Sequence, residues 1–252
     1  MITRRRFVSL VTGVLATLLF SGACRSEDQQ FETNDGRLAA RPGVNSAKPS
    51  PGQSYLELDP ARDAILLIPK KLGDGPIPLL VLLHGAGGRA EAVLSRMGSA
   101  PDETGVAVLA VNSRYHTWDA IRHDFGPDVT FLNRALENVF ETIPVDKERM
   151  AIGGFSDGAT YALSLGLING DLFNRVVAFS PGFVVEGAAH GKPRFFISHG
   201  TSDTILPIDR CSRRIVSDLR KAGYEITLRE FEGGHTVPAD IALEGLRWVA
   251  ER

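Results

Sequence analysis

A serine stands between two glycines in the stretch Gly154-Phe155-Ser156-Asp157-Gly158. An unbroken apolar run precedes this stretch, and a segment with helical periodicity follows it. A serine on a sharp turn between a strand and a helix exposes its hydroxyl, and side chains at the two glycine positions would crowd such a turn. The pattern therefore predicts Ser156 as a nucleophile, although it also suits a serine that caps a helix.

A serine hydroxyl becomes a good nucleophile only when a base removes its proton. Three histidines follow Ser156 in the chain, namely His190, His199 and His235. His235 comes after the last apolar run and before the last predicted helix, so its loop can carry the imidazole toward the serine. We predict His235 as the base. His199 lies near a strand end and is interpreted as a packed or hydrogen-bonded residue, and His190 lies in a polar loop.

The base in turn needs a carboxylate that orients it and stabilises the imidazolium. Asp203 lies just beyond an apolar run and is the predicted acid. Asp209 and Asp240 are the alternatives, but each lies where a helix is expected to begin, so a helix-start role is expected for both.

The stretch His84-Gly85-Ala86-Gly87-Gly88 follows another apolar run. Acyl transfer needs two backbone N–H groups that hold the developing oxyanion. We predict Ala86 as one donor, with Gly85 as its alternative, and Asp157 as the other. A phosphate-binding loop is the competing interpretation, but the stretch lacks the Lys-Ser/Thr ending of a P-loop and the glycine spacing of a dinucleotide turn.

Short apolar runs alternate with longer amphipathic segments, and this order predicts an α/β fold with a mostly parallel central sheet flanked by helices. The predicted strands are 64–69, 79–84, 106–112, 150–155, 176–180, 195–199 and 226–231, with an antiparallel edge strand near 55–58. The predicted helices are 90–98, 128–142, 158–169, 208–222 and 239–251. The candidate residues follow predicted strands, where sites in open α/β sheets are expected.

The motifs occur in the order Leu-His-Gly-Ala-Gly-Gly, Gly-Phe-Ser-Asp-Gly, His-Gly-x-x-Asp-x-x-Leu-Pro and Gly-Gly-His. This order resembles the α/β-hydrolase superfamily, and it is similar to the phospholipase/carboxylesterase and polyhydroxybutyrate-depolymerase-like esterases over roughly residues 64–252. The resemblance implies the α/β-hydrolase fold, a Ser-His-Asp triad with an acyl-enzyme intermediate, and no metal or other cofactor. The carboxylesterase group usually has glutamine after the serine, where this chain has Asp157.

The long connection after the run 106–112 carries aromatic residues and is expected to overhang the cleft. We predict Tyr115 and Trp118, together with Gly85, as substrate-binding residues, suited to an apolar or aromatic ester. Packing of Trp118 onto the body of the protein is the alternative. The connection 181–193 is short, which predicts an open cleft with no large lid.

The leading hypothesis is an exported serine esterase that acts on a small-molecule or polymeric ester. A serine peptidase or amidase of the same fold, and a catalytically silent hydrolase fold used for binding, are the alternatives. Lys and Arg total 28 and Asp and Glu total 30, so the formal net charge is −2 and no nucleic-acid partner is expected. The sequence leaves the oligomeric state open.

Residues 1–23 combine an arginine-rich start with an apolar run and are predicted to be an export signal that resembles the twin-arginine type. Cys24 follows three small residues, so the segment also resembles a lipoprotein cleavage site, in which a lipidated Cys24 would tether the protein to a membrane. Ser21 departs from that pattern, and a plain membrane anchor is the alternative. Residues 24–54 are predicted to be a flexible tether and residues 55–252 the hydrolase domain, in a periplasmic, membrane-anchored or secreted protein.

Overall fold

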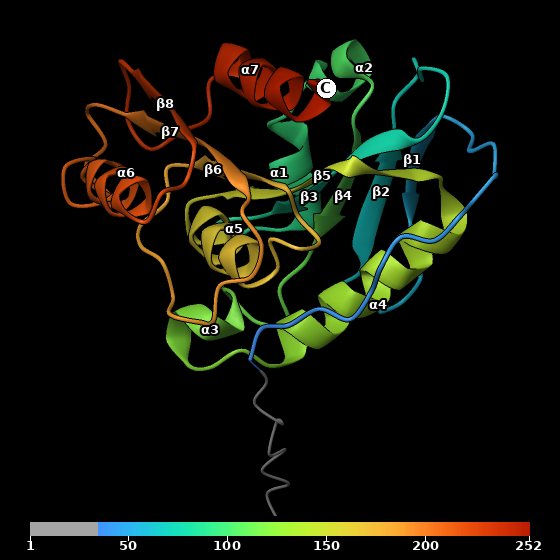
Figure 1. Ribbon diagram of the computed structural model, residues 1–252, viewed down its shortest axis with the longest axis horizontal. Coiled ribbons are helices and arrows are strands. Elements are labelled where there is room, and N and C mark those ends of the chain that lie inside the picture. Colours follow the sequence, from blue (N-terminus) through green and yellow to red (C-terminus); the bar gives the residue numbers. More distant parts are fainter. Residues whose placement is uncertain (1–34) are drawn as a thin grey trace, which may run out of the picture. The chain divides into compact units, whose positions relative to one another are not determined.

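The computed structural model describes residues 35–252, which form an eight-stranded sheet with helices on both faces (Figure 1). The strand order is β1-β2-β4-β3-β5-β6-β7-β8. The strands are β1 (Gly52–Tyr55), β2 (Ala64–Ile68), β3 (Ile77–Leu83), β4 (Ala107–Val111), β5 (Val145–Phe155), β6 (Arg175–Phe179), β7 (Arg194–Gly200) and β8 (Ile226–Phe231). The helices are α1 (Ala90–Ser95), α2 (Ala100–Thr104), α3 (Asp119–Arg122), α4 (Pro127–Thr142), α5 (Asp157–Ile168), α6 (Ser212–Lys221) and α7 (Ala239–Ala250). The predicted α/β class is confirmed.

The sheet is parallel from β4 to β8, and its other edge is antiparallel. The sequence predicts an antiparallel edge strand near 55–58, but β1 ends at Tyr55. Glu57 has a φ of 59°, and the N–H groups of Glu57 and Leu58 donate to the Asp63 carboxylate. This turn ends the strand, because a residue with positive φ cannot continue a β ladder.

The core consists of two apolar layers, one on each face of the sheet. Helices α4, α5 and α6 contribute to one layer and α1 and α7 to the other. Along β3, Val81 and Leu83 face the first layer while Leu80 and Leu82 face the second, and all four are fully buried. Coverage on both faces explains why the central strands are unbroken apolar runs in the sequence.

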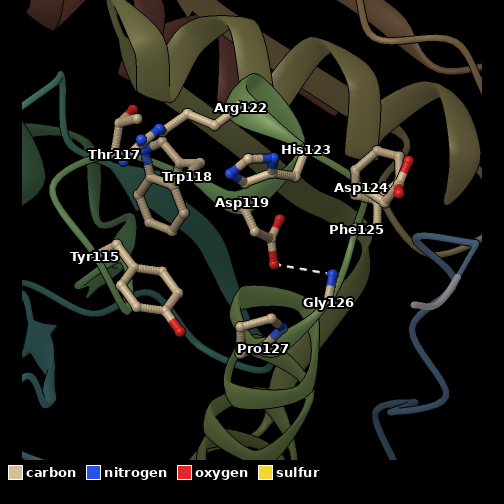
Figure 2. A pocket seen from close by; sticks show the side chains of 10 residues that line it. All are labelled: Tyr115, Thr117, Trp118, Asp119, Arg122, His123, Asp124, Phe125, Gly126 and Pro127. Carbon is tan, nitrogen blue, oxygen red and sulfur yellow. Dashed lines mark hydrogen bonds between the residues drawn. The ribbon is translucent and has the colours of Figure 1, made fainter. Parts of the chain in front are cut away.

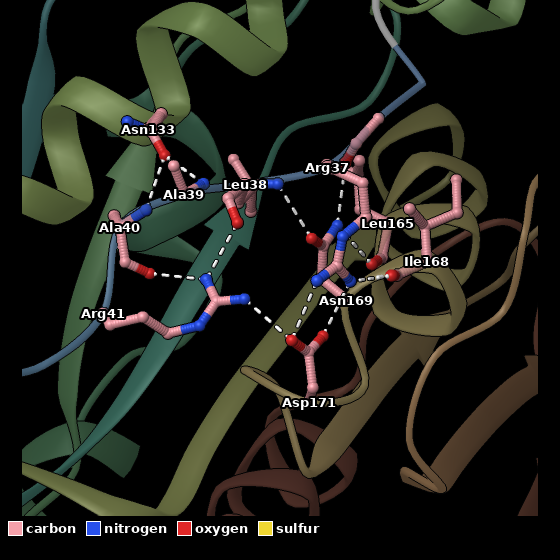
Figure 3. A network of polar contacts seen from close by, with 11 residues as sticks. Arg37, Leu38, Ala39, Ala40, Arg41, Asn133, Leu165, Ile168, Asn169 and Asp171 are labelled. Atoms are coloured by element: carbon pink, nitrogen blue, oxygen red, sulfur yellow. Dashed lines mark hydrogen bonds and ion pairs between the residues drawn. The ribbon is translucent and has the colours of Figure 1, made fainter.

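Residues 36–48, here called the N-terminal strap, lie along α4 and the end of α5 (Figure 3). Leu38 is buried in the core, and its N–H donates to the Asn169 side chain at 2.9 Å. The Asn133 side-chain oxygen accepts the N–H groups of Ala39 and Ala40, both at 2.8 Å. The prediction of a flexible tether is therefore wrong for the strap, because two asparagine side chains satisfy its backbone donors and the core buries its leucine.

An ion-pair cluster adds to the attachment of the strap (Figure 3). The Arg37 guanidinium donates to both oxygens of the Asp171 carboxylate, at 2.7 and 2.9 Å, and Arg41 donates to the same carboxylate at 2.8 Å. The body of the fold thus begins ahead of the predicted boundary at Tyr55. The predicted export signal and Cys24 lie outside the described residues. Within residues 35–252, no helix combines the length and the apolar character needed to cross a membrane.

Candidate active site

Ser156 occupies the turn between β5 and α5, with a φ of 59° and a ψ of −121°. A side chain at Gly154 would place its Cβ 2.5 Å from the Gly158 backbone, and one at Gly158 would overlap the Leu83 carbonyl oxygen. The two glycines are therefore required by close backbone packing, as the sequence pattern indicated. A positive φ is costly for serine and is typical of nucleophile elbows.

The structure brings Ser156, His235 and Asp203 together, although they lie on three separate strand-to-helix connections. His235 Nε2 lies 2.8 Å from Ser156 Oγ, and His235 Nδ1 lies 2.6 Å from Asp203 Oδ2. With Nδ1–H donating to the carboxylate, Nε2 is free to accept the serine proton. The Phe155 ring packs against the imidazole with a centroid distance of 4.7 Å, which supports the orientation of the ring.

The Asp203 carboxylate is buried and fully hydrogen-bonded. Its Oδ1 accepts the N–H groups of Ile205 and Leu206, both at 2.9 Å. Burial alone would raise the pKa of this carboxyl, but the Leu206 N–H, the His235 ring and the Ile205 N–H together hold the pKa below its usual value. Asp203 is therefore an ionised carboxylate that orients the His235 ring.

The two alternative acids lie elsewhere. The Asp209 carboxylate accepts a hydrogen bond from Arg213 at 2.8 Å, and Asp240 lies in the first turn of α7. The position of Asp240 agrees with the helix-start role that the sequence indicated. Asp209 lies in the connection before α6, which begins only at Ser212, so the helix-start role is wrong for Asp209.

His199 is a second ring on the same carboxylate, and it was not among the predicted site residues. Its Nε2 lies 2.7 Å from the Leu206 carbonyl oxygen and 3.2 Å from Asp203 Oδ2, and its Nδ1 accepts from Ser212 Oγ at 2.7 Å. Burial lowers the pKa of His199, so the ring is neutral at pH 7. The interpretation of His199 as a hydrogen-bonded residue is confirmed, and its place at the end of β7 was the available signal for its contact with Asp203.

The glycine-rich loop after β3 lies against Ser156, since a Cβ on Gly85 would approach Ser156 Cβ to 3.2 Å. His84 Nδ1–H donates to the Gly85 carbonyl at 2.7 Å, and the Gly88 N–H donates to the same oxygen at 2.9 Å. A peptide's N–H points opposite to its C=O, so these bonds fix the direction of the Ala86 N–H. Within residues 35–252, neither the Ala86 N–H nor the Asp157 N–H donates a hydrogen bond.

The Asp157 carboxylate is held by a neighbouring loop. It accepts a hydrogen bond from the Thr117 hydroxyl at 2.6 Å. Asp157 is also the first residue of α5, where the helix dipole favours a negative charge. The side chain thus has a structural partner of its own, separate from its backbone N–H.

The connection between β4 and α4 lines a cavity of about 390 Å³ (Figure 2). The lining residues are Tyr115, Thr117, Trp118, Asp119, Arg122, His123, Asp124, Phe125, Gly126 and Pro127. Tyr115 lies on the cavity wall with 47% of its surface exposed. Trp118 is fully buried, its ring stacks on Tyr161 at a centroid distance of 5.1 Å, and its Nε1–H donates to the His84 carbonyl at 2.8 Å. Trp118 is among the residues that line the cavity, but its burial and its stacking on Tyr161 fit the alternative interpretation, in which the ring packs onto the body of the protein.

Two buried carboxylates fix this loop to the start of α4. Asp128 accepts the N–H groups of Arg114 and Asp119, and Asp119 accepts those of Gly126 and Asp128. The Tyr161 hydroxyl donates to Asp119 at 2.7 Å, which ties the loop to α5 as well.

In the described part of the chain, no group of three or more His, Cys, Asp or Glu side chains is arranged as a metal site.

Comparisons with known proteins identify a family and several relatives that this chain resembles. Residues 127–241 match the phospholipase/carboxylesterase family model. The "Putative esterase NocK" of Nocardia uniformis subsp. tsuyamanensis is 29% identical over 146 residues, which cover 54% of this chain and 42% of that protein. The chain spans about half or less of the length of the curated relatives it matches first.

Two solved structures share the architecture. Esterase PE8 superimposes with a TM-score of 0.60 at 21% identity, covering 73% of this chain and 95% of its own. FphF, a fluorophosphonate-binding serine hydrolase of Staphylococcus aureus, superimposes with a TM-score of 0.64 at 16% identity, covering 81% and 100%. The chain therefore has the α/β-hydrolase fold, and its residues 127–241 match the phospholipase/carboxylesterase family.

Proposed function

We propose that this protein is a carboxylic ester hydrolase in which Ser156, His235 and Asp203 form the catalytic triad. The observation that carries the proposal is the unbroken hydrogen-bond chain from the serine hydroxyl through the imidazole to the carboxylate, with distances of 2.8 and 2.6 Å. The strained backbone at Ser156 supports it, because such strain persists mainly where function requires it. The match to the phospholipase/carboxylesterase family gives independent support.

The reaction follows from the roles of these groups. His235 takes the proton of Ser156 as the hydroxyl oxygen attacks the ester carbonyl, and the N–H groups of Ala86 and Asp157 hold the oxyanion. The imidazolium then protonates the departing alcohol, which leaves an acyl-serine. Water, activated by the same histidine, cleaves that acyl-serine and restores the free enzyme. Each step uses only protein groups and water.

The proposed substrate is a small-molecule or polymeric ester that reaches an open site. The connection between β6 and β7 contains no helix that could act as a lid. Tyr115 offers an exposed aromatic surface on the loop whose Thr117 contacts Asp157. Gly85 keeps the oxyanion loop free of a side chain next to Ser156, so the ester carbonyl can approach the hydroxyl.

A fluorophosphonate probe combined with a substrate panel tests the proposal. The wild type is expected to be labelled on Ser156 and to hydrolyse p-nitrophenyl acetate, butyrate or longer esters faster than peptide anilides. Ser156→Ala is expected to lose labelling and turnover while retaining its circular dichroism spectrum, whereas Ser95→Ala, at an exposed serine of α1, serves as the matched control. Preference for anilides would indicate a peptidase or amidase, and a wild type without labelling or turnover would indicate a binding module.

We further propose that the protein is exported and that Cys24 is lipidated, on the basis of the residues around positions 4–24. Metabolic labelling with palmitate in a host that processes lipoproteins tests this. Incorporation that disappears in Cys24→Ser is the expected result. A soluble, unmodified product outside the cytoplasm would support export and exclude lipidation.

A further inference from the structure

The two proposed oxyanion donors belong to segments that are far apart in the sequence. Ala86 lies in the loop after β3, and Asp157 begins α5. Each donor must point at the same oxygen within a few tenths of an ångström, because donors act on an oxyanion only at about 2.7–3.1 Å. Contacts that join the two segments therefore bear directly on catalysis.

One tripeptide, His116-Thr117-Trp118, hydrogen-bonds to both segments, and is here called the clasp. The His116 carbonyl accepts the Gly87 N–H at 2.7 Å, and the Trp118 Nε1–H donates to the His84 carbonyl at 2.8 Å. These two bonds flank Ala86 on either side. The Thr117 hydroxyl donates to the Asp157 carboxylate at 2.6 Å. This third bond connects the clasp to the segment that carries the Asp157 N–H.

The clasp is itself rigidly mounted. Trp118 stacks on Tyr161 of α5, and the next residue, Asp119, exchanges hydrogen bonds with Asp128 at the start of α4. Thr117 is only 6% exposed, so water competes little for its hydroxyl. A hydrogen bond from a buried hydroxyl to a carboxylate is charge-assisted and stronger than one between neutral groups.

We propose that Thr117 is a positioning residue for the oxyanion hole, a role that rests on the proposed esterase function. Its bond to Asp157 sets the first turn of α5 relative to the loop that carries Ala86. The same bond turns the Asp157 carboxylate toward Thr117. A negative charge left free beside the forming oxyanion would oppose the transition state, so both effects act on kcat.

Thr117→Val keeps the shape of the side chain and removes only the hydroxyl. We expect kcat on p-nitrophenyl acetate to fall about tenfold, since a displacement of about 1 Å in an active site can lower the rate about a hundredfold. KM is expected to change less than about twofold, because the lost interaction acts on the transition state. A trifluoromethyl ketone, whose adduct with Ser156 places an oxyanion in the hole, is expected to bind more weakly by a similar factor.

Three further variants separate positioning from packing. Thr117→Ser retains the hydroxyl and is expected to restore most of kcat and of ketone affinity. Asp157→Ala breaks the clasp from the other side, so combining it with Thr117→Val is expected to cost no more than the worse single change. Thr142→Val, at the exposed end of α4, is the matched control and is expected to match the wild type.

Several outcomes would overturn the positioning role of Thr117. They are a Thr117→Val enzyme with wild-type kcat and ketone affinity, a loss that appears only in KM, and a Thr117→Ser enzyme as impaired as Thr117→Val. If Thr117→Val does not fold, kcat and ketone affinity are compared between Asp157→Ala, which breaks the hydrogen bond, and Thr117→Ser, which keeps it. A wild type that neither reacts with fluorophosphonate nor hydrolyses esters would overturn the proposed function itself. The two failures are distinguishable, because the positioning role is tested only by comparing variants of an active enzyme.

Discussion

Two buried carboxylates of this protein, Asp203 and Asp128, differ in charge state although their backbone environments are alike. Each accepts two backbone N–H groups, and each is at most 5% exposed. Asp203 also contacts two imidazole rings, whereas Asp128 has a second carboxylate, Asp119, as its neighbour. The pKa of Asp203 lies below its usual value, while burial and the Asp119 charge raise the pKa of Asp128 to about 7.

The neighbouring side chain therefore determines the role of a buried carboxylate in this protein. Asp203 keeps its charge and faces a ring that gains a proton during the proposed reaction, so it stabilises a changing charge. Asp128 accepts fixed backbone donors and lies near another acid and the charge of Arg114, so it holds a loop in place. The first is expected to matter for rate and the second for stability.

Asp203→Asn tests the first half of this contrast and carries the largest expected effect. An amide in this position favours the wrong imidazole tautomer, and kcat is expected to fall by roughly 10⁴-fold. Ester hydrolysis at saturating substrate measures the loss, and circular dichroism checks the fold. Asp209→Asn, an exposed carboxylate in the connection before α6, is the matched control. A loss of less than tenfold in Asp203→Asn would contradict the assignment of the acid.

Asp128→Ala tests the second half. The change leaves the N–H groups of Arg114 and Asp119 without an acceptor in a buried site. Each of the two unsatisfied groups costs about 1–3 kcal/mol, so the free energy of unfolding is expected to fall by about 2–6 kcal/mol. Urea denaturation measures it, with the exposed Asp124→Ala on the same loop as control. Equal stability of the two variants would show that Asp128 does not hold the loop.

The two carboxylates are expected to respond to pH in opposite directions. The unfolded chain releases the Asp128 proton near pH 4, whereas the folded protein keeps it up to about pH 7. The stabilising contribution of Asp128 is therefore full below about pH 4 and is lost as the pH rises to about 7. The pKa of Asp203 is lowered, so its contribution is present above about pH 4 and is lost as the pH falls.

Urea unfolding midpoints measured from pH 5 to pH 8 test the pH dependence expected for Asp128. The wild type is expected to lose stability across this range relative to Asp128→Asn, because the variant has no carboxyl to titrate there. Parallel curves for the two proteins would show that the Asp128 carboxyl is already ionised at pH 5.

Asp171→Asn is expected to have the smallest effect. This carboxylate pairs with Arg37 and Arg41 of the N-terminal strap, but 38% of its side chain is exposed. Exposed ion pairs contribute about 1 kcal/mol or less, so the change in unfolding free energy is expected to stay below that value. Thermal melting measures it, and kcat is expected to match the wild type. A loss comparable to that of Asp128→Ala would show that exposure does not separate these carboxylates.

Much of the fold followed from the sequence because each central strand is an apolar run that ends in a chemically distinctive residue. Ser156, Asp203 and His235 each follow such a run, and parallel strands bring their carboxyl ends to one edge. The elbow glycines were informative for the same reason, since local crowding at Gly154 and Gly158 depends on residues near them in the chain.

The remaining features depend on contacts between distant residues. The burial of Trp118 requires Tyr161, and the order of the strap requires Asn133 and Asn169. Single side chains of this kind leave no periodic pattern, so the sequence of this polar, proline-containing segment predicts a tether. The bond between Thr117 and Asp157 spans forty positions and was invisible for the same reason.

The strap also determines where the chain can be cut. A shortened protein that begins at Tyr55 would lose Leu38 and most of β1 and would uncover apolar surface on α4 and α5. The Asn169 side chain would lose its partners Gly36 and Leu38 and keep only the Leu165 carbonyl. Exposed apolar surface of this kind promotes aggregation. Expression of such a fragment would therefore yield insoluble material from a sequence whose catalytic motifs are all intact, and a useful recombinant boundary lies before the strap.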